Sequence, residues 1–456
     1  MSATLALVPI LVFALAAWRG VNFLAPAACA GALAALLLAG FPAGVLPRAF
    51  WIAAPMAAVL FAGVLLREVA NPRVTAAAPR DAAQAHRRLF VACFLVGPFF
   101  ECAVGFGIGA MFALPFIFAA HRKAANAAAL AMLTQCLVPW GALAIGVMGS
   151  ADIANVTAIA VGQAAVAAVA WMLPPFLICF WWLVRDLGVS WAQRAGDAAW
   201  LAVLWLVLDF VGARATPDAT GIVATGLVAG ARLLWDERPT PAQALRVIGA
   251  NWPYVALTLA LAGSRLVPEI GTFTKAVAFP TASNLPAFAP FHHASFWLLV
   301  VALLASRGGN LPLAAAWSQS ARPIFAGFAF VLFGEALAQG GFAATLVASF
   351  TGVAGSAAIA VVPILAILGG ATIGSTLAAS AINLPLTLPL MGANPVTVIG
   401  AHAAIAAAFT AFSPARVTLV AGLAGLAGDA GAVYRELRPL VAILCVAAAA
   451  LFAWGV

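Results

Sequence analysis

Long apolar segments separated by short polar stretches run along the whole chain. Most hold about 20 residues, the length at which one helix crosses the hydrocarbon core of a bilayer. They are rich in Ala, Leu and Val and lack the polar–apolar alternation of a membrane β-barrel. The pattern predicts an all-α polytopic membrane protein with about 12 transmembrane helices. The predicted spans are 3–18, 22–41, 49–66, 125–149, 157–184, 197–212, 217–232, 251–264, 294–306, 323–349, 396–428 and 439–455, with polar loops at 67–88, 233–248 and 265–292.

Two further apolar segments, 89–120 and 357–391, are longer than a single span requires. Arginine and lysine flank 89–120 on both sides, so both of its ends are expected on the cytoplasmic side. Glycines interrupt its centre, which predicts a re-entrant hairpin with its tip at 101–109. The flanks of 357–391 are uncharged and its own glycines are central, which predicts a hairpin of the opposite orientation.

Each predicted hairpin is followed by a long apolar segment with a break. The segment 125–149 is interrupted at Pro139-Trp140-Gly141, and 396–428 at Ser413-Pro414. Hairpin plus broken helix, present twice with opposite orientation, is the organisation of secondary transporters built from inverted repeats. We expect a first repeat at 1–250 and a second at 251–456. Two long tilted helices with incidental glycines are the alternative.

Composition agrees with a membrane protein and narrows its class. The chain is 65% hydrophobic and 8% charged, whereas a soluble globular domain has about 25% charged residues. The net charge of +8 comes from basic residues in short loops, so it indicates cytoplasmic retention of loops and no nucleic-acid binding. Placing the arginine-rich loop 67–88 in the cytoplasm predicts both termini on the outer side of the cell inner membrane.

Glu101 is the strongest candidate for chemistry. A carboxylate in the middle of an apolar segment usually marks an ion or substrate path, because burying its charge in lipid is costly. Desolvation favours the protonated form of a carboxyl group, so Glu101 is predicted to carry a proton. The alternative is a structural carboxylate that caps the second hairpin limb. Glu335, with Gln339 one turn later, is a second intramembrane carboxylate that could relay protons or pair with a cation such as Arg416.

Anion binding is expected at the two chain breaks. Gly105, Gly107 and Gly109, with Phe106 between them, allow a helix start whose free N–H groups can bind an anion. Arg416, just after Ser413-Pro414, can hold a carboxylate, although snorkelling to the headgroups is its alternative role. The remaining candidate contacts are Gln135, Trp140, Gly141, Gln163, Gly374, Ser375, Thr376 and Ser380.

Other kinds of site are not predicted. His292 and His293 lack acidic or cysteine partners at metal-ligand spacing, so no metal site is expected. The six cysteines are scattered through apolar segments as small buried hydrophobes. No nucleophile–base set stands out, so we expect neither an enzyme nor a cofactor.

Several motifs resemble those of the L-lactate permease family over essentially the whole chain. Phe-Glu-Cys-Ala-Val-Gly-Phe-Gly at 100–107 is similar to the family's L-E-G-A-A-G-F-G motif. The segment 139–146 resembles its P-V-A-F-G-A-x-G-I segment, and Gly162-Gln163 its G-R-Q. The stretch 413–417, followed by 424–428, resembles its S-P-Q-S-I-A-I-A run and glycine-containing tail. The resemblance implies a proton symporter for small monocarboxylates such as lactate and glycolate, with Glu101, Gly105 and Gly107 as motif positions.

Two departures affect the substrate. The family's T-G-S-D-T-S-S-N motif is present only as Ile373-Gly374-Ser375-Thr376 with Ser380, without its aspartate and asparagine. Arg416 is a cation that the family's run lacks. Both changes favour an anion at the second break, so a different small organic anion is an equal candidate. An uncoupled anion channel is the alternative mechanism, and both a monomer and a homodimer remain open.

Overall fold

The computed structural model describes residues 2–17, 24–70, 78–105, 107–120, 122–281, 285, 287–392, 395–426 and 429–454. Within these ranges the regular elements are helices, joined by turns and one isolated bridge between Phe279 and Phe288. The first half contains α1 (Ala3–Ala17), α2 (Leu24–Ala39), α3 (Val45–Ala70), α4 (Ala82–Val91), α5 (Gly97–Val104), α6 (Ile108–Ala119), α7 (Ala124–Met132), α8 (Gly141–Ala154), α9 (Ala158–Leu183), α10 (Trp191–Gly212), α11 (Pro217–Glu237) and α12 (Pro241–Ala250). The second half contains α13 (Trp252–Leu266), α14 (Pro268–Lys275), α15 (Ala294–Ala305), α16 (Leu313–Gln339), α17 (Phe342–Ala354), α18 (Val361–Ile373), α19 (Thr376–Thr387), α20 (Pro395–Phe409), α21 (Pro414–Leu423) and α22 (Ala430–Trp454).

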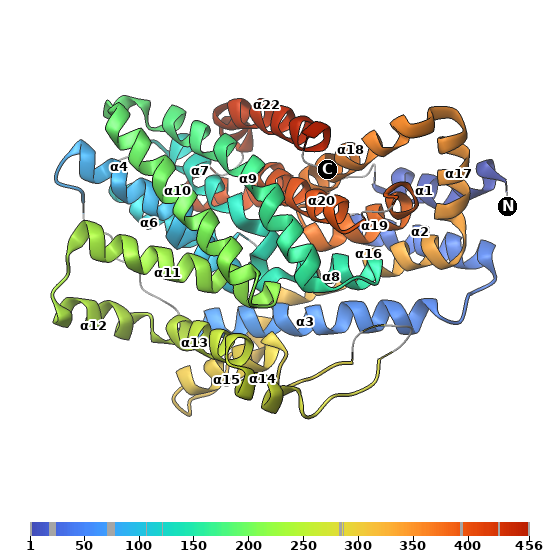
Figure 1. Cartoon of the computed structure of the whole chain (residues 1–456), viewed down its shortest axis with the longest axis horizontal. Helices are drawn as coiled ribbons and strands as arrows, with labels where there is room; N and C mark the ends of the chain where they lie inside the picture. Colours follow the sequence, from blue (N-terminus) through green and yellow to red (C-terminus); the bar gives the residue numbers. More distant parts are fainter. Residues whose placement is uncertain are drawn as a thin grey trace.

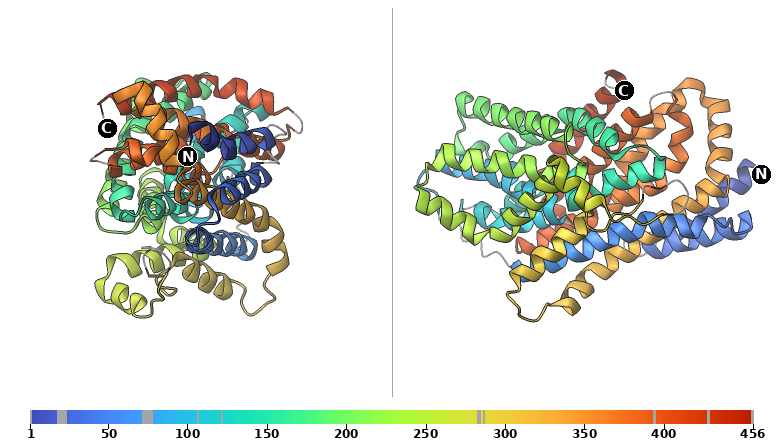
Figure 2. Two further views of the ribbon diagram at one scale, coloured as in Figure 1. Left: turned by 90° about the vertical axis from the view of Figure 1, so that its right-hand side faces the viewer. Right: turned by 60° about the horizontal axis from the view of Figure 1, so that its bottom comes forward.

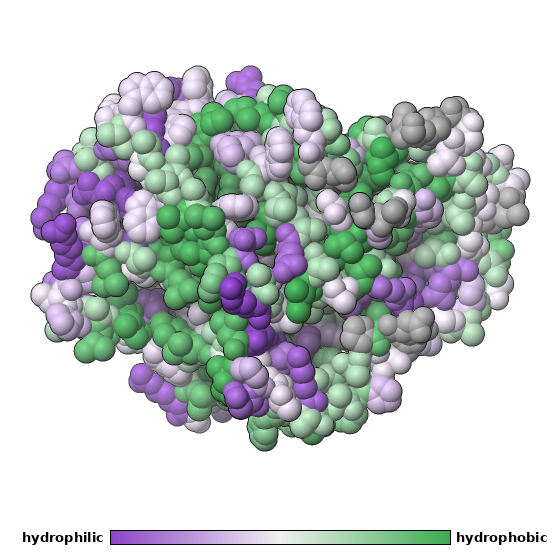
Figure 3. Space-filling view, viewed as in Figure 1, coloured by the Kyte–Doolittle hydropathy of each residue, from purple (hydrophilic) through white to green (hydrophobic). Residues whose placement is uncertain are grey.

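The helices have the lengths and composition of an α-helical membrane protein. Among the described residues, seven are long and apolar enough to cross a bilayer, and α12 with α13 forms one further candidate bent by 85°. Shorter apolar helices account for much of the remainder. Hydrophobic residues cover much of the surface in Figure 3, with hydrophilic ones concentrated at the left-hand end and in a smaller central group. The prediction of a membrane-embedded, all-α chain agrees with this architecture.

The apolar segment 89–120 doubles back on itself. A π-helical turn, Ala92–Val96, leads from α4 into α5, and the chain reverses at Gly105 and Gly107. Both glycines have φ near +80°, a backbone conformation that residues with a Cβ rarely adopt. The rings of Phe100 and Phe112 stack with centroids 3.7 Å apart across the reversal. Helices α5 and α6 therefore form an antiparallel pair, which we call hairpin 1.

The segment 357–391 forms a second antiparallel pair, hairpin 2, from α18 and α19. Its reversal is at Gly374, where φ is +71°. The Asn383 side chain donates a hydrogen bond of 2.8 Å to the Leu365 carbonyl on the facing limb. In Figure 1, α4 and α6 extend to the left, whereas α17 and the start of α18 lie at the right. The two hairpins thus approach the centre from opposite ends of the molecule.

The two interrupted helices also have the predicted breaks. In the first, α7 passes into a 3₁₀ segment, Leu133–Trp140, before α8. In the second, α20 continues as a 3₁₀ turn, Thr410–Phe412, and the chain is extended at Ser413 before α21. The second segment ends at Leu423, earlier than expected, and residues 427–428 lie outside the described part of the chain.

Some predicted boundaries are wrong. The span expected at 323–349 is divided into α16 and α17, because Gly341 turns the chain with φ +76°. Helix α16 starts ten residues before the predicted boundary, at Leu313, since polar residues such as Gln319 hid its first turns. The loop expected at 233–248 contains most of α12, which begins at a Thr240–Gln243 capping box. The loop expected at 265–292 contains α14.

The other long helices form a frame around the hairpins. Helix α3 packs along α16, α2 packs on α1 and α16, and α9 packs against α20 of the second interrupted helix. Figure 2 shows α3 and the gold α16 running side by side below the hairpin region. This frame brings the reversals of both hairpins and the breaks of both interrupted helices into one buried region.

Candidate functional site

The Glu101 side chain is fully buried at the end of α5. One of its carboxylate oxygens accepts hydrogen bonds from the backbone N–H groups of Gly107 at 3.0 Å and Gly109 at 3.2 Å. These donors belong to the start of α6, where the first N–H groups of a helix have no intrahelical partner. Glu101 therefore occupies the anion-binding end of α6, as the capping alternative expected.

Arg416 is a further hydrogen-bond partner of the Glu101 carboxylate. Its Nη1 atom donates to Glu101 Oε1 at 2.9 Å and also to the side-chain oxygen of Gln135. Its Nε atom donates to the Gly374 carbonyl at 3.1 Å, at the reversal of hairpin 2. We call Glu101 and Arg416 the central pair. Because both groups are buried, each needs the other's charge to offset the cost of desolvation.

Small residues let the reversals of the two hairpins and the breaks of the two interrupted helices approach one another closely. A Cβ atom on Gly105 would lie 2.6 Å from the Cβ of Ala142, just after the break of the first interrupted helix. A Cβ on Gly146 would lie 2.6 Å from that of Thr376, at the start of α19. A Cβ on Gly374 would collide with Ser413. The central pair is thus enclosed by backbone from both halves of the chain.

The backbone beside the central pair is strained. Ala142, Leu143 and Ala144 all have φ between +48° and +58°. A left-handed conformation costs an L-residue roughly 1–2 kcal/mol, and such strain concentrates at functional sites. Gly141, which precedes them, lies over Glu101, with the position of a Cβ 3.7 Å from the Glu101 carbonyl oxygen. Sequence reasoning located this break but gave no signal for the left-handed turn, since alanine and leucine seldom adopt it.

The predicted residues of the second half lie around the same region. Ser375 and Ser413 are the N-caps of α19 and α21, and the Ser413 hydroxyl accepts from the Arg416 N–H. Thr376 and Ser380 are buried. The Ser150 hydroxyl donates to that of Ser380 at 2.8 Å, which links hairpin 2 to α8.

Two predicted contacts, Gln163 and Trp140, stand apart from this cluster. Gln163 is exposed on α9, so the structure does not bring it to the site. Its neighbour Gly162 faces inward against Pro217, and the next residue of a helix points about 100° away. Trp140 is buried against Gly221 of α11, and its indole N–H has no hydrogen-bond partner among the described groups. Phe106 lies outside the described residues.

Glu335 pairs with a cation, as one alternative predicted, but that cation is Arg48 and not Arg416. Its Oε1 atom lies 3.1 Å from Nε of Arg48, and its Oε2 atom accepts from Gln339 at 2.8 Å. Arg48 also donates to the Asp152 carbonyl at the end of α8, at 2.7 Å. We call Arg48 and Glu335 the second pair. Sequence reasoning missed Arg48, although an arginine at the margin of an apolar segment was the available signal.

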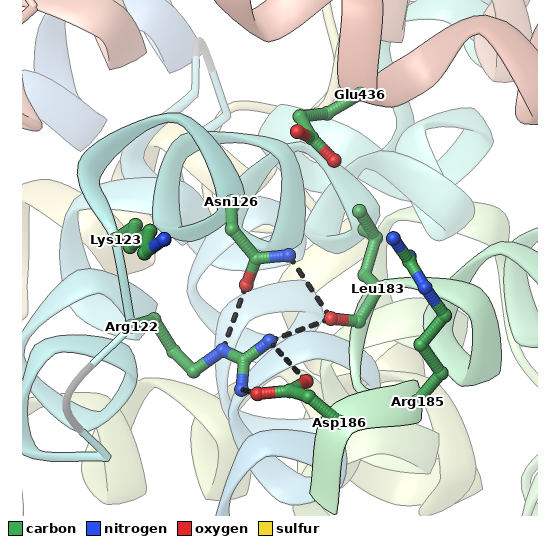
Figure 4. Close-up of a pocket in the computed structure, with 7 residues that line it drawn as sticks. All are labelled: Arg122, Lys123, Asn126, Leu183, Arg185, Asp186 and Glu436. Atoms are coloured by element: carbon green, nitrogen blue, oxygen red, sulfur yellow. Dashed lines mark hydrogen bonds and ion pairs between the residues drawn. The ribbon is translucent and has the colours of Figure 1, made fainter.

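The base of hairpin 1 is fixed by a hydrogen-bond cluster beside a pocket of about 320 Å³ (Figure 4). Arg122 donates to both carboxylate oxygens of Asp186, at 2.7 and 2.8 Å, and to the Leu183 carbonyl at 2.6 Å. The Asn126 amide donates to the same carbonyl at 3.0 Å. The hydrogen bond from Arg122 lowers the pKa of Asp186. This cluster ties the turn between α6 and α7 to the end of α9.

The described residues contain no group of three or more His, Cys, Asp or Glu side chains arranged to hold a metal ion. No protein-family model matches the chain, and no curated protein matches it.

Proposed function

We propose that this chain is a secondary active transporter that moves a small organic anion together with protons. The observation that carries the proposal is the central pair, since Glu101 and Arg416 meet where two opposed hairpins and two interrupted helices converge. Intramembrane ionisable residues at discontinuous helices are typical of ion-coupled transport sites. The motif resemblance to L-lactate permeases is an independent argument for the same class.

The contacts of Glu101 suggest how proton and anion binding are coupled. Its carboxylate accepts from two N–H groups of α6 and from Arg416, which are the donors that a substrate carboxylate needs. A proton on Glu101 removes its negative charge and releases these donors. The anion then binds Arg416 in place of Glu101, so the buried site is neutral before either has bound and again after both have bound. Binding of the proton therefore favours binding of the anion, and binding of the anion favours binding of the proton.

We infer that the substrate is a small monocarboxylate such as lactate or glycolate. The site offers one buried guanidinium, flanked by the Gln135 amide and the backbone of hairpin 2. A single cation matches one carboxylate, whereas a second carboxylate would remain unpaired at high cost. Another small organic anion with one carboxylate fits the same chemistry.

We place the chain in the cytoplasmic membrane with its arginine-rich loops on the cytoplasmic side and both termini on the outer side. In this arrangement both hairpins are re-entrant, with about 12 further spans around them in two inverted repeats. Transport requires the hairpins and interrupted helices to move against the frame that contains α3 and α16. Such a motion exposes the central pair to each side in turn.

Uptake into proteoliposomes tests this function. Wild-type protein is expected to accumulate labelled lactate or glycolate under an inward proton gradient. Glu101→Gln imitates the protonated carboxyl, so it is expected to lose gradient-driven accumulation and to keep substrate exchange. Arg416→Gln is expected to lose both. Glu269→Gln, at an exposed residue of α14, is the matched control and should behave as wild type.

Two results would contradict the proposal. Accumulation in Glu101→Gln with the same dependence on the proton gradient would refute the proton role of this residue. Anion flux without proton movement in wild-type protein would identify an uncoupled channel. A parallel screen with pyruvate and short dicarboxylates sets the substrate class.

A further inference from the structure

A second pocket of about 320 Å³ lies between α3, α16, hairpin 1 and α21. Its apolar wall includes Val104 and Ile108, the residues on either side of the reversal of hairpin 1, and Leu419 of α21. Its polar wall is formed by Arg67, Gln319 and Ser320.

The pocket adjoins the central pair through the reversal of hairpin 1. The Gly107 N–H donates to the Glu101 carboxylate, while the position of a Cβ on the same residue lies 3.4 Å from the Leu419 side chain. Leu419 follows Arg416 by one turn of α21. Gly107 therefore contacts the central pair in one direction and the pocket wall in another.

Arg67 supplies the positive charge of the pocket. Its guanidinium donates to the Glu68 carboxylate on the same helix and to the Gln319 amide oxygen on α16. The side chains of Arg67 and Glu68 are 18% and 27% exposed. Partly exposed ion pairs contribute little net stability, so an incoming carboxylate can replace Glu68 at small cost.

We propose that this pocket is a separate binding site for the transported anion, a vestibule in which Arg67 holds a monocarboxylate before it reaches Arg416. This inference rests on the proposed function and extends it to one face of the membrane. Arg67 is near the C-terminal end of α3 and Gln319 near the N-terminal end of α16, so the vestibule opens towards the arginine-rich, cytoplasmic side. The apolar wall suits a short aliphatic tail and offers no partner to a second carboxylate.

Transport measured separately from each face tests the role of Arg67. In inside-out vesicles, Arg67→Gln is expected to raise KM for lactate presented at the cytoplasmic face by about tenfold, equivalent to about 1.4 kcal/mol. KM at the outer face should stay unchanged, and Arg67→Lys should restore most of the affinity. Equal KM values for wild type and Arg67→Gln at the cytoplasmic face would overturn the vestibule.

Thiol labelling tests the same site without relying on transport. Met111 of α6 lines the pocket, so Met111→Cys, in a chain with Cys445→Ser, is expected to react with a charged thiol reagent from the cytoplasmic face. Lactate should slow this reaction. Leu313→Cys, at the exposed start of α16, is the control, with labelling that lactate leaves unchanged.

The outcomes separate the two proposals. Labelling of Met111→Cys that lactate does not slow would overturn the vestibule, whatever the transport assays show. Protection of Met111→Cys together with proton-coupled uptake in Glu101→Gln would support the vestibule and refute the coupling role of Glu101.

Discussion

The central pair and the second pair are both buried, and each joins distant parts of the chain. Glu101 and Arg416 are 315 residues apart, and Arg48 and Glu335 are 287 apart. They differ in the backbone that surrounds them. Glu101 accepts from N–H groups at a chain reversal, whereas Glu335 lies within the continuous helix α16 and accepts from Gln339 one turn away. The carboxylate at the chain break thus has backbone donors in addition to its cation, whereas the carboxylate of the second pair has side-chain donors.

The position of the second pair indicates a different task. Arg48 is near the start of α3 and Glu335 near the end of α16, at the opposite ends of these helices from Arg67 and Gln319. Arg48 also holds the carbonyl end of α8, the helix that follows the first break. The second pair thus joins the end of α8 to the α3–α16 frame, at the end of the frame opposite to Arg67 and Gln319.

The largest expected effect tests whether the central pair is a true charge pair. Arg416→Gln leaves the Glu101 carboxylate buried without its cation, which costs about 3–5 kcal/mol of unfolding free energy. The double variant Glu101→Gln with Arg416→Gln removes both charges and should recover most of that loss, while transport stays absent. Thermal unfolding in detergent measures both effects. Equal destabilisation in the single and double variants would show that charge pairing does not hold this site together.

The next prediction concerns the close approach of backbones that distinguishes the central pair. Gly105 and Gly40 both have positive φ, but a Cβ on Gly105 would meet Ala142, whereas one on Gly40 would meet nothing within 4 Å. Gly40→Ala therefore reports backbone strain alone, about 1–2 kcal/mol. Gly105→Ala is expected to cost about 1–3 kcal/mol more, because the added methyl group overpacks the break and because ψ of −165° places Gly105 in a backbone region that is essentially restricted to glycine. Equal unfolding temperatures for the two variants would mean that hairpin 1 is loosely packed at its reversal.

A smaller effect is expected when both members of the second pair are neutralised. Arg48→Gln with Glu335→Gln removes both charges, so the change in unfolding free energy should be close to zero. Proton-coupled uptake should keep its dependence on the pH gradient, in contrast to Glu101→Gln. Proton and lactate fluxes measured in parallel give the number of protons moved with each anion. A changed proton-to-anion ratio would move Glu335 into the coupling machinery, where the sequence first placed it.

The sequence identified the features that depend on local chemistry. Neighbouring residues alone are enough to predict a carboxylate in an apolar run, glycines that permit a reversal, and a helix break at Ser413-Pro414. The partner of a buried charge cannot be predicted in this way, because pairing depends on how helices that are distant in the sequence pack together. Glu335 was therefore expected to pair with a cation such as Arg416, and Arg48 was overlooked. Gln163 failed for a similar reason, since the exposed side of α9 is set by its neighbours.

A further small effect concerns an ion pair with an exposed carboxylate, which serves as a reference for the two buried pairs. The hydrogen bond from Arg122 lowers the pKa of Asp186, so the folded state binds this proton less readily than the unfolded state. The resulting stabilisation is present above the ordinary aspartate pKa of about 3.9 and is lost as pH falls through the lower folded value. Asp186→Asn should therefore lower the unfolding temperature slightly at neutral pH and not at strongly acidic pH. Because the Asp186 side chain is 62% exposed, this shift should be far smaller than that of Arg416→Gln. Comparable shifts for the two variants would mean that burial does not distinguish the central pair from an ordinary surface contact.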